Sequence, residues 1–438
     1  MLQDSIKRIL KKEYDIENVQ VKIIGKTLGV HLPLEKLFSA NLDSFSDNTD
    51  EKSVEDLFKF DPHAMEKIEH VLFSMSRVIM STDRPLDFYV LKAAETETTG
   101  IELILTGYIS DMKRVRFWDI AISEYRKRLL HDLSVNRTII WKRTIRDFFN
   151  HISQLSLTDL MKQYFTTTVT FKDISPFFYS QLAEAEYKDK LQFKLLRVKT
   201  KPISEKEVLV YVKVHVTYIP YEGYEQYEFL FENNAEHEYL FILQAEMTSY
   251  KIHRIIPFYY IDENRTVHTL DFPEELKIFD NIDMWSEEFE LEEVFMGSFL
   301  AQQLTKRVQA LIVQDERIQS IFPIVKGEFT YYEPITAGEG TDTEAGYYSF
   351  NYLTQTKDDL FSRERQTPSE DEMRGTKLYL LSKVFEEFTK VVYSYKFKDF
   401  EYVRLYNEMS KESITIPANR LEQFRKNKIT IDALIGGL

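Results

Sequence analysis

Three side chains that could ligate a metal share one predicted helix. His63, Glu66 and His70 lie at positions i, i+3 and i+7, so all three point to one side of the helix, as zinc or iron ligands would require. This spacing is not that of the His-Glu-x-x-His motif, and a divalent metal needs a further ligand from elsewhere in the chain. Polar stripes are also ordinary on the solvent face of a helix. The sequence therefore favours a solvated face, no bound metal and no cofactor.

A second group of side chains has the chemistry to bind anions. Residues 113 to 146 contain ten Lys or Arg and three Asp or Glu, a surplus of seven positive charges in a chain of net charge −15. Such asymmetry points to phosphate groups, lipid head groups or nucleic acid. The alternative is pairing with acidic neighbours such as the glutamates between 287 and 293, which the interleaved aromatic residues favour. The candidate anion-binding surface consists of Lys113, Arg114, Arg116, Arg126, Lys127, Arg128, Lys142 and Arg143.

Catalytic residues cannot be assigned from the sequence. His215, Tyr218, His253 and Tyr259 fall on predicted strands of one meander, and histidine is the natural general base near neutral pH, but no partner for such a base is placed. No Gly-x-Ser-x-Gly elbow, phosphate-binding glycine loop or dinucleotide fingerprint is present. The absence of cysteine excludes disulfides, thiolate metal sites and a cysteine nucleophile. These observations lean against an enzyme.

Composition limits the class of protein. With 438 residues, 43% of them apolar and 14% aromatic, the chain can fill the cores of two or three domains. Its acidity argues against a protein that coats nucleic acid, and its 26 Tyr and 32 Phe suit cores and contact surfaces. No apolar run reaches the length of a membrane helix and the first residues are polar, so the cytoplasm is the default location, with an exported mature chain as the alternative.

The elements that must position these residues form a multidomain α+β protein. We predict an N-terminal domain at 1–135, a central domain at 136–265 and a C-terminal domain at 266–438. Both terminal domains show the order helix, two strands, helix, strand. Asp61 with Pro62, and Thr367 with Pro368, predict the starts of the second helices. An internal duplication explains this order, and coincidence between two common α+β units is the alternative.

The central domain alternates in a way typical of an antiparallel meander that follows helices. Tyr250, Lys251, Ile252 and Ile255 match a closing strand of the form aromatic, Lys, Ile, x, x, Ile, so residues 155–262 resemble NTF2-like domains. The resemblance implies a cone-shaped sheet around a long helix, whose mouth in that family holds a ligand, a catalytic pair or only packed side chains. The candidate ligand pocket in this cone is lined by Phe178, Leu182, Val212, Val214, Tyr239 and Phe241.

The sequence as a whole favours a non-enzymatic binding or scaffold protein that works through contacts with protein partners. Missing catalytic signatures, tyrosine-rich strands and the repeated order of elements support this interpretation. The alternative is a small-ligand or catalytic pocket in the central cone. Nucleic acid is not expected as a partner, no transmembrane segment is predicted, and peripheral contact with a membrane stays open.

Overall fold

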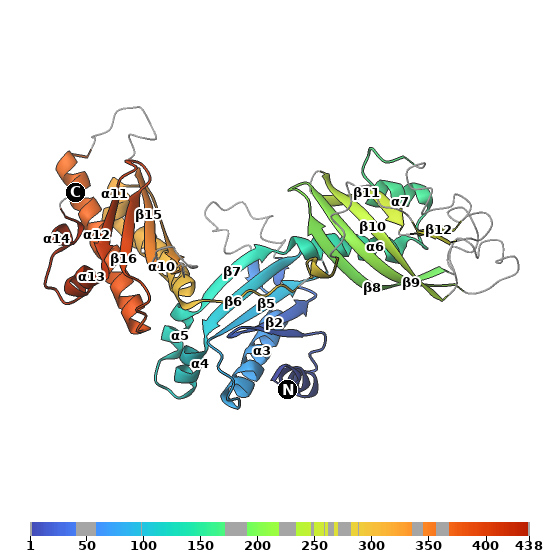
Figure 1. Ribbon diagram of the computed structural model, residues 1–438, viewed down its shortest axis with the longest axis horizontal. Helices are drawn as coiled ribbons and strands as arrows, with labels where there is room; N and C mark the ends of the chain where they lie inside the picture. The colour runs from blue at the N-terminus through green and yellow to red at the C-terminus, as the bar shows by residue number, and fades with distance from the viewer. Residues whose placement is uncertain are drawn as a thin grey trace, which may run out of the picture. The chain divides into compact units, whose positions relative to one another are not determined.

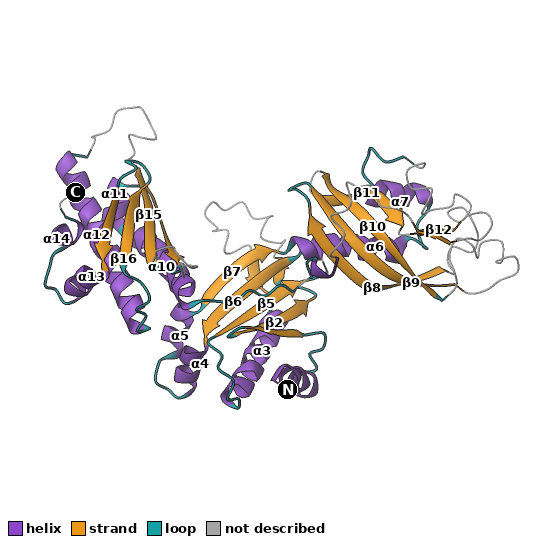
Figure 2. Ribbon diagram, viewed as in Figure 1, coloured by secondary structure: helices purple, strands orange, loops and turns teal. Residues whose placement is uncertain are grey.

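The computed structural model shows a multidomain α+β protein, as the sequence predicts (Figure 1; Figure 2). Contacts divide the chain into two compact units, Met1–Phe117 with His131–Glu292, and Trp118–Leu130 with Glu293–Leu438. The finer division into three domains stays a prediction. The residues described by the structure are 2–40, 58–97, 99–170, 191–218, 234–246, 249–257, 259–261, 267–269, 282–287, 289–334, 345–355 and 368–436.

The first unit contains a five-stranded sheet of order β1-β2-β5-β6-β7. Strands β1 and β2 are antiparallel, β2 and β5 are parallel, and β5 and β6 are antiparallel. Helix α3 begins where the sequence predicts, because Asp61 accepts hydrogen bonds from the backbone N–H groups of His63 and Ala64. The elements are α1 (Leu2–Tyr14), β1 (Gln20–Ile24), β2 (Thr27–Leu34), β3 (Phe38–Ala40), β4 (Phe58–Phe60), α3 (Pro62–Met80), β5 (Phe88–Glu95), β6 (Ile101–Tyr108), α4 (Ile109–Arg116) and β7 (Leu130–Val135).

One face of this sheet is covered by a piece of chain from far along the sequence. Residues 285–287 and 289–291, here called the covering segment, place Phe289 and Leu291 directly over Gly29 of β2. The ring of Phe289 stacks on His31 with centroids 5.5 Å apart, and Lys22 donates a 2.8 Å hydrogen bond to the carbonyl of Phe289. The covering segment thus buries this face of β2 as well, including the polar side chain of His31.

The first unit also contains a four-stranded antiparallel sheet of order β11-β10-β9-β8, against which α6 packs (Figure 1). The alternating valines of β9 face α6 and bury Phe148 and Phe149 between helix and sheet. On the opposite face Trp285 of the covering segment packs against Tyr211 and Leu240. The elements are α6 (Arg137–His151), α7 (Leu157–Tyr164), β8 (Leu191–Pro202), β9 (Glu207–Tyr218), β10 (Ala235–Glu246), β11 (Ser249–Pro257), β12 (Tyr259–Ile261), β13 (Val267–Thr269) and η5 (Ile282–Met284).

The second unit contains a four-stranded sheet of order β14-β15-β16-β17. Its directions repeat those of the first sheet, since β14 and β15 are antiparallel, β15 and β16 parallel, and β16 and β17 antiparallel. On its inner face Phe329 and Tyr348 contact Phe388 of α12, and Gly327 lies near Val308 of α10. The elements are α5 (Ile122–Arg128), α10 (Met296–Gln314), α11 (Glu316–Ile321), β14 (Ile324–Tyr332), β15 (Tyr347–Gln355), α12 (Glu370–Ser394), β16 (Tyr402–Asn407), β17 (Ser413–Pro417), α13 (Ala418–Arg425) and α14 (Ile431–Ile435).

The start of α12 differs from the prediction by two residues. Ser369, not Thr367, caps the helix, because the Ser369 hydroxyl accepts a hydrogen bond from the backbone N–H of Glu372. The carboxylate of Glu372 in turn accepts a hydrogen bond from the backbone N–H of Ser369. Thr367 with Glu370 and Ser369 with Glu372 both fit the Ser/Thr-x-x-Glu form. In the structure, Ser369 and Glu372 form the capping box.

Candidate functional site

Three tyrosines form a row across the outer face of the C-terminal sheet, opposite the face that packs against α10 and α12. Tyr332 pairs in register with Tyr347, and Tyr347 pairs with Tyr402. The ring centroids of Tyr332 and Tyr347 are 4.6 Å apart, and those of Tyr347 and Tyr402 are 4.8 Å apart, with interplanar angles of 12° and 13°. Tyr332 is 44% exposed and the other two are partly exposed. The sheet therefore presents a stacked tyrosine row to its surroundings.

The stacking decides which part of each ring is available. Since both faces of the Tyr347 ring stack on its neighbours, its edge and hydroxyl group remain for contact with another molecule, whereas Tyr332 and Tyr402 each use one ring face in the row. The next register row contains Ser349, Arg404 and Thr415. The guanidinium of Arg404 lies 5.7 Å from the centroid of the Tyr406 ring, which holds it along the face. Ser349 is buried and its hydroxyl donates a hydrogen bond to Asn351, so the exposed Arg404 and Thr415 supply the hydrogen-bonding groups beside the rigid aromatic area.

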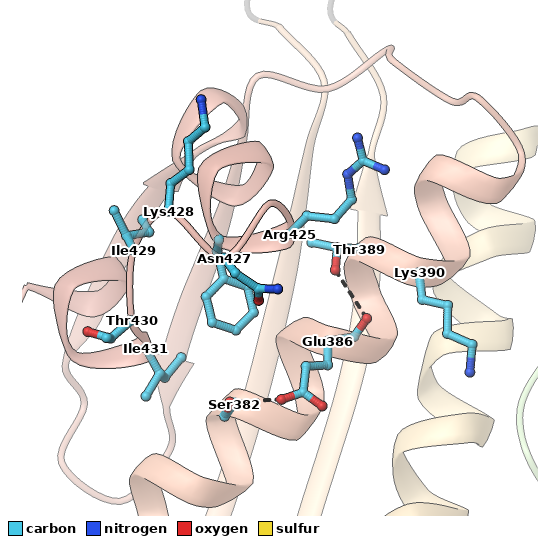
Figure 3. Close-up of a pocket in the computed structure, with 11 residues that line it drawn as sticks. Ser382, Glu386, Thr389, Lys390, Arg425, Asn427, Lys428, Ile429, Thr430 and Ile431 are labelled. Carbon is cyan, nitrogen blue, oxygen red and sulfur yellow. Dashed lines mark hydrogen bonds between the residues drawn. The ribbon is translucent and has the colours of Figure 1, made fainter.

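A recess of about 590 Å³ lies in the same unit between α12 and the turn that joins α13 to α14 (Figure 3). Its charged lining residues are Glu386, Lys390, Arg425 and Lys428. Glu386 accepts a 3.1 Å hydrogen bond from the hydroxyl of Ser382. Figure 3 shows Lys428 and Arg425 extending to one side and Lys390 to the other, none of them toward the carboxylate of Glu386. The arrangement therefore provides no converging acid and base.

The predicted ligand pocket of the central region is only partly described. Phe178 and Leu182 lie outside the described residues. Val212, Val214, Tyr239 and Phe241 are buried in the cluster between α6 and the sheet. The Phe241 ring meets Phe148 and Phe149 edge to face at 5.8 Å. These four predicted lining residues thus contribute to packing, and their role in binding a ligand stays a prediction.

The weak metal candidate does not gain a ligand from its surroundings. His63 and Glu66 are exposed on α3, whereas the ring of His70 stacks on Tyr14 with centroids 4.1 Å apart. Among the described residues, no group of three or more His, Asp or Glu side chains is arranged to hold a metal ion. His63 and Glu66 therefore lie on a solvent-exposed side of α3, whereas His70 is half-buried against Tyr14.

The predicted anion-binding residues fall into separate places. Those on α4 belong to the first unit and those on α5 to the second. Arg128 pairs with Glu124 at 2.9 Å, and Arg114 lies 3.4 Å from Asp111. Lys142 is nearly buried on α6. The exposed residues of the set are Lys113, Arg116, Arg126 and Lys127. The other member, Arg143, has a buried guanidinium nitrogen without a hydrogen-bond partner. A single common surface formed by all eight stays a prediction.

The histidines of the meander each have their own neighbour. His215 Nε2 lies 3.1 Å from the amide oxygen of Asn234, and His253 Nδ1 lies 3.3 Å from the hydroxyl of Thr166. The side chains of Tyr218 and Tyr259 lie outside the described residues. Neither histidine therefore has a carboxylate partner among these contacts, which a general base would need to fix its ring.

The structure also contains a hydrogen-bonded His–Tyr pair that the sequence does not predict. His151 at the end of α6 is hydrogen-bonded through Nδ1 to the hydroxyl of Tyr164 at the end of α7. Burial, with the charge of Asp147 as a second cause, raises the pKa of Tyr164 to about 12. The pair is formed by the packing of two helices, so no short motif announces it. A neutral phenol and a single imidazole give this pair a structural role in joining α6 to α7.

No family model, curated protein or solved structure matches this chain. Within the described residues, no helix is both long enough and apolar enough to cross a membrane. A function for this chain therefore rests on the tyrosine row, the recess beside α12 and the buried contacts within each unit.

Proposed function

We propose that this chain is a non-enzymatic binding protein that works through contacts with protein partners, and that the outer face of the C-terminal sheet is its contact surface. The observation that carries the proposal is the row of Tyr332, Tyr347 and Tyr402. Tyrosine and arginine are enriched at protein interfaces because they supply large rigid contact area together with hydrogen bonds. The row and the neighbouring Arg404 provide both.

The chemistry of the face argues for a protein rather than a sugar or a nucleobase. Sugars and bases stack on open ring faces, whereas the middle ring of the row has both faces occupied by its neighbours. Ring edges and phenol hydroxyls suit peptide groups and side chains, which offer donors and acceptors at many angles. The net charge of −15 also opposes a nucleic-acid backbone.

An internal duplication is part of the same proposal. The first sheet and the C-terminal sheet share the strand directions antiparallel, parallel, antiparallel, and in each the parallel pair is joined through a long helix. We infer that one ancestral unit was copied, with an NTF2-like domain between the copies. One copy then kept its outer face for internal packing, and the other presents it to a partner.

A site-specific cross-linker tests the contact surface. A photoreactive phenylalanine is introduced at Thr415, which is exposed on β17, and in a matched protein at Lys428, which is exposed outside the sheet face in the same unit. In the native host, the Thr415 protein is expected to form a discrete protein adduct that the Lys428 protein does not form. Combining the Thr415 probe with Tyr332→Ser and Tyr402→Ser should abolish the adduct. An adduct that survives both substitutions would contradict the proposal.

A further inference from the structure

A second recess, of about 350 Å³, lies in the first unit and is lined by four cationic side chains and one carboxylate. The cations are Lys142 and Arg146 of α6, and Arg197 and Lys199 of β8; the carboxylate is Glu287. The volume is at the small end of the range for ligand sites, so any occupant is a small molecule.

Secondary structure aligns the cations in two pairs. Lys142 and Arg146 are four residues apart on a helix and share a face, and Arg197 and Lys199 are two apart on a strand and share a face. Lys142 is 9% exposed and Lys199 is 4% exposed. Lys199 also donates a 2.6 Å hydrogen bond to the backbone carbonyl of Asp283. Because four cationic groups face one carboxylate in the lining, the recess has a preference for an anion.

The walls of the recess are held in place by backbone pairing. Strand β8 is the edge of its sheet, and its register shifts by one residue between Leu195 and Arg197, where the lining begins. The backbone N–H of Ser286 donates to the carbonyl of Thr200 at 2.9 Å, and the Thr200 N–H donates back at 3.3 Å. These two bonds fix the covering segment along the edge of β8, next to Glu287.

Nearby groups report a positive potential at this place. The pKa of the Glu287 carboxyl is lowered, first by its hydrogen bond from Lys22 and then by the charges of Lys22, Lys199 and Lys142. The pKa of His31 is lowered to about 4, first by burial and then by Lys92, Lys142 and Lys22. Positive charge lowers the pKa of Glu287 through Lys22, Lys199 and Lys142, whereas for His31 it adds to the larger effect of burial.

We infer that this recess binds a small anion carrying a phosphate group. Arg197 and Lys199 are held by Asp283, whose side chain is 80% exposed, at 2.5 Å and 3.9 Å. A phosphate dianion in the recess would take these donors from an exposed carboxylate that water can solvate. The guanidinium fork of Arg197 suits two phosphate oxygens, and the buried ammonium groups of Lys199 and Lys142 supply compensating charge.

Titration with inorganic phosphate at constant ionic strength tests the site, because constant salt removes general screening as a cause. Calorimetry on the wild-type chain is expected to show saturable binding to one site. Arg197→Gln should weaken it about tenfold, since it removes a charge-assisted bidentate contact. The matched control is Lys194→Gln, which removes an exposed charge from the same strand outside the recess and should leave binding unchanged.

Three results would overturn the inference: no saturable heat, equal weakening by Arg197→Gln and Lys194→Gln, or full binding by Lys199→Met. Thermal unfolding of each variant is measured first. Arg146→Gln replaces any variant that does not fold, because the Arg146 side chain is partly exposed and its substitution should disturb the fold less. A parallel titration with glycerol 3-phosphate separates the two sources of the same chemistry. Tighter binding of the ester identifies a phosphomonoester as the ligand class, and tighter binding of the ion identifies phosphate itself.

Discussion

The first sheet and the C-terminal sheet have the same strand directions but opposite uses for their outer faces. On the first sheet, Phe289 and Leu291 of the covering segment lie over Gly29, and His31 is 1% exposed beneath them. On the C-terminal sheet the corresponding side carries the tyrosine row, which is exposed or partly exposed. On the first sheet, the small Gly29 leaves room for the side chains of the covering segment. On the C-terminal sheet, the stacked tyrosine rings project from a face that stays exposed or partly exposed.

Topology alone does not decide which face of a sheet lies in the interior. Strands β2 and β15 are both second in their sheets and both run parallel to the strand after the long helix. The difference between them lies in residue size and in the presence of a distant segment that fits. Substitutions in the covering segment should therefore lower the free energy of unfolding strongly. Substitutions in the tyrosine row should change it little and should instead remove contacts with a partner.

Removal of the main covering side chain is expected to have the largest effect. Phe289→Ala deletes a fully buried ring that stacks on His31 and touches the site of Gly29, and should lower the free energy of unfolding by about 3 kcal/mol or more. Chemical denaturation measures the change. Ile203→Ala, at an exposed apolar position of the same unit, should stay within about 0.5 kcal/mol of wild type. Equal losses in the two variants would mean that the cover contributes no specific packing.

Acid should weaken the covered face through His31. The unfolded chain takes up a proton on this residue near pH 6.5, whereas the folded chain does so only near pH 4. The stabilising contribution is therefore present above pH 6.5 and is lost as the pH falls toward 4, by about 2 to 3 kcal/mol at the lower end. Denaturation of wild type and His31→Phe at a series of pH values isolates it. A variant with the same acid dependence as wild type would exclude His31 as the cause.

A single added methyl group should distinguish a tight cover from a loose one. A Cβ atom at Gly29 would lie 2.6 Å from both terminal carbons of Leu291, so Gly29→Ala should cost about 2 kcal/mol by displacing the cover. The matched control is Gly375→Ala in α12, where nothing lies within 4 Å, and it should stabilise the helix by up to about 1 kcal/mol. Unfolding free energies with the same sign for both variants would contradict a tightly packed cover.

The tyrosine row should show the smallest effect on stability. Tyr347→Ser removes two stacking contacts on a partly exposed face, and we expect a loss of at most about 1 kcal/mol in unfolding free energy. The same substitution should remove the cross-link formed from position 415. A loss comparable to that of Phe289→Ala would show that the row is a core and not a contact surface.

Local features of the fold are predictable from the sequence, and the surfaces are less so. The Asp61-Pro62 cap follows from two adjacent residues, and the valine alternation of β9 follows from strand geometry. The recess on β8 is different, because Lys142 joins Arg197 and Lys199 only after α6 packs along the sheet edge. Alternation along a strand indicates which side chains share a face, as on β15. It does not indicate whether a segment far along the chain covers that face, as the covering segment does on β2.

Native mass spectrometry of gently purified protein tests the central claim most directly, because one spectrum reports every bound chain. The account predicts that the wild-type protein carries the added mass of a protein partner, and that the same protein with Tyr332→Ser and Tyr402→Ser is detected without it. Because the double variant loses the same two stacking contacts as Tyr347→Ser, its unfolding free energy should lie within about 1 kcal/mol of wild type. An identical partner mass on wild type and variant would contradict the claim that the outer face of the C-terminal sheet is the contact surface.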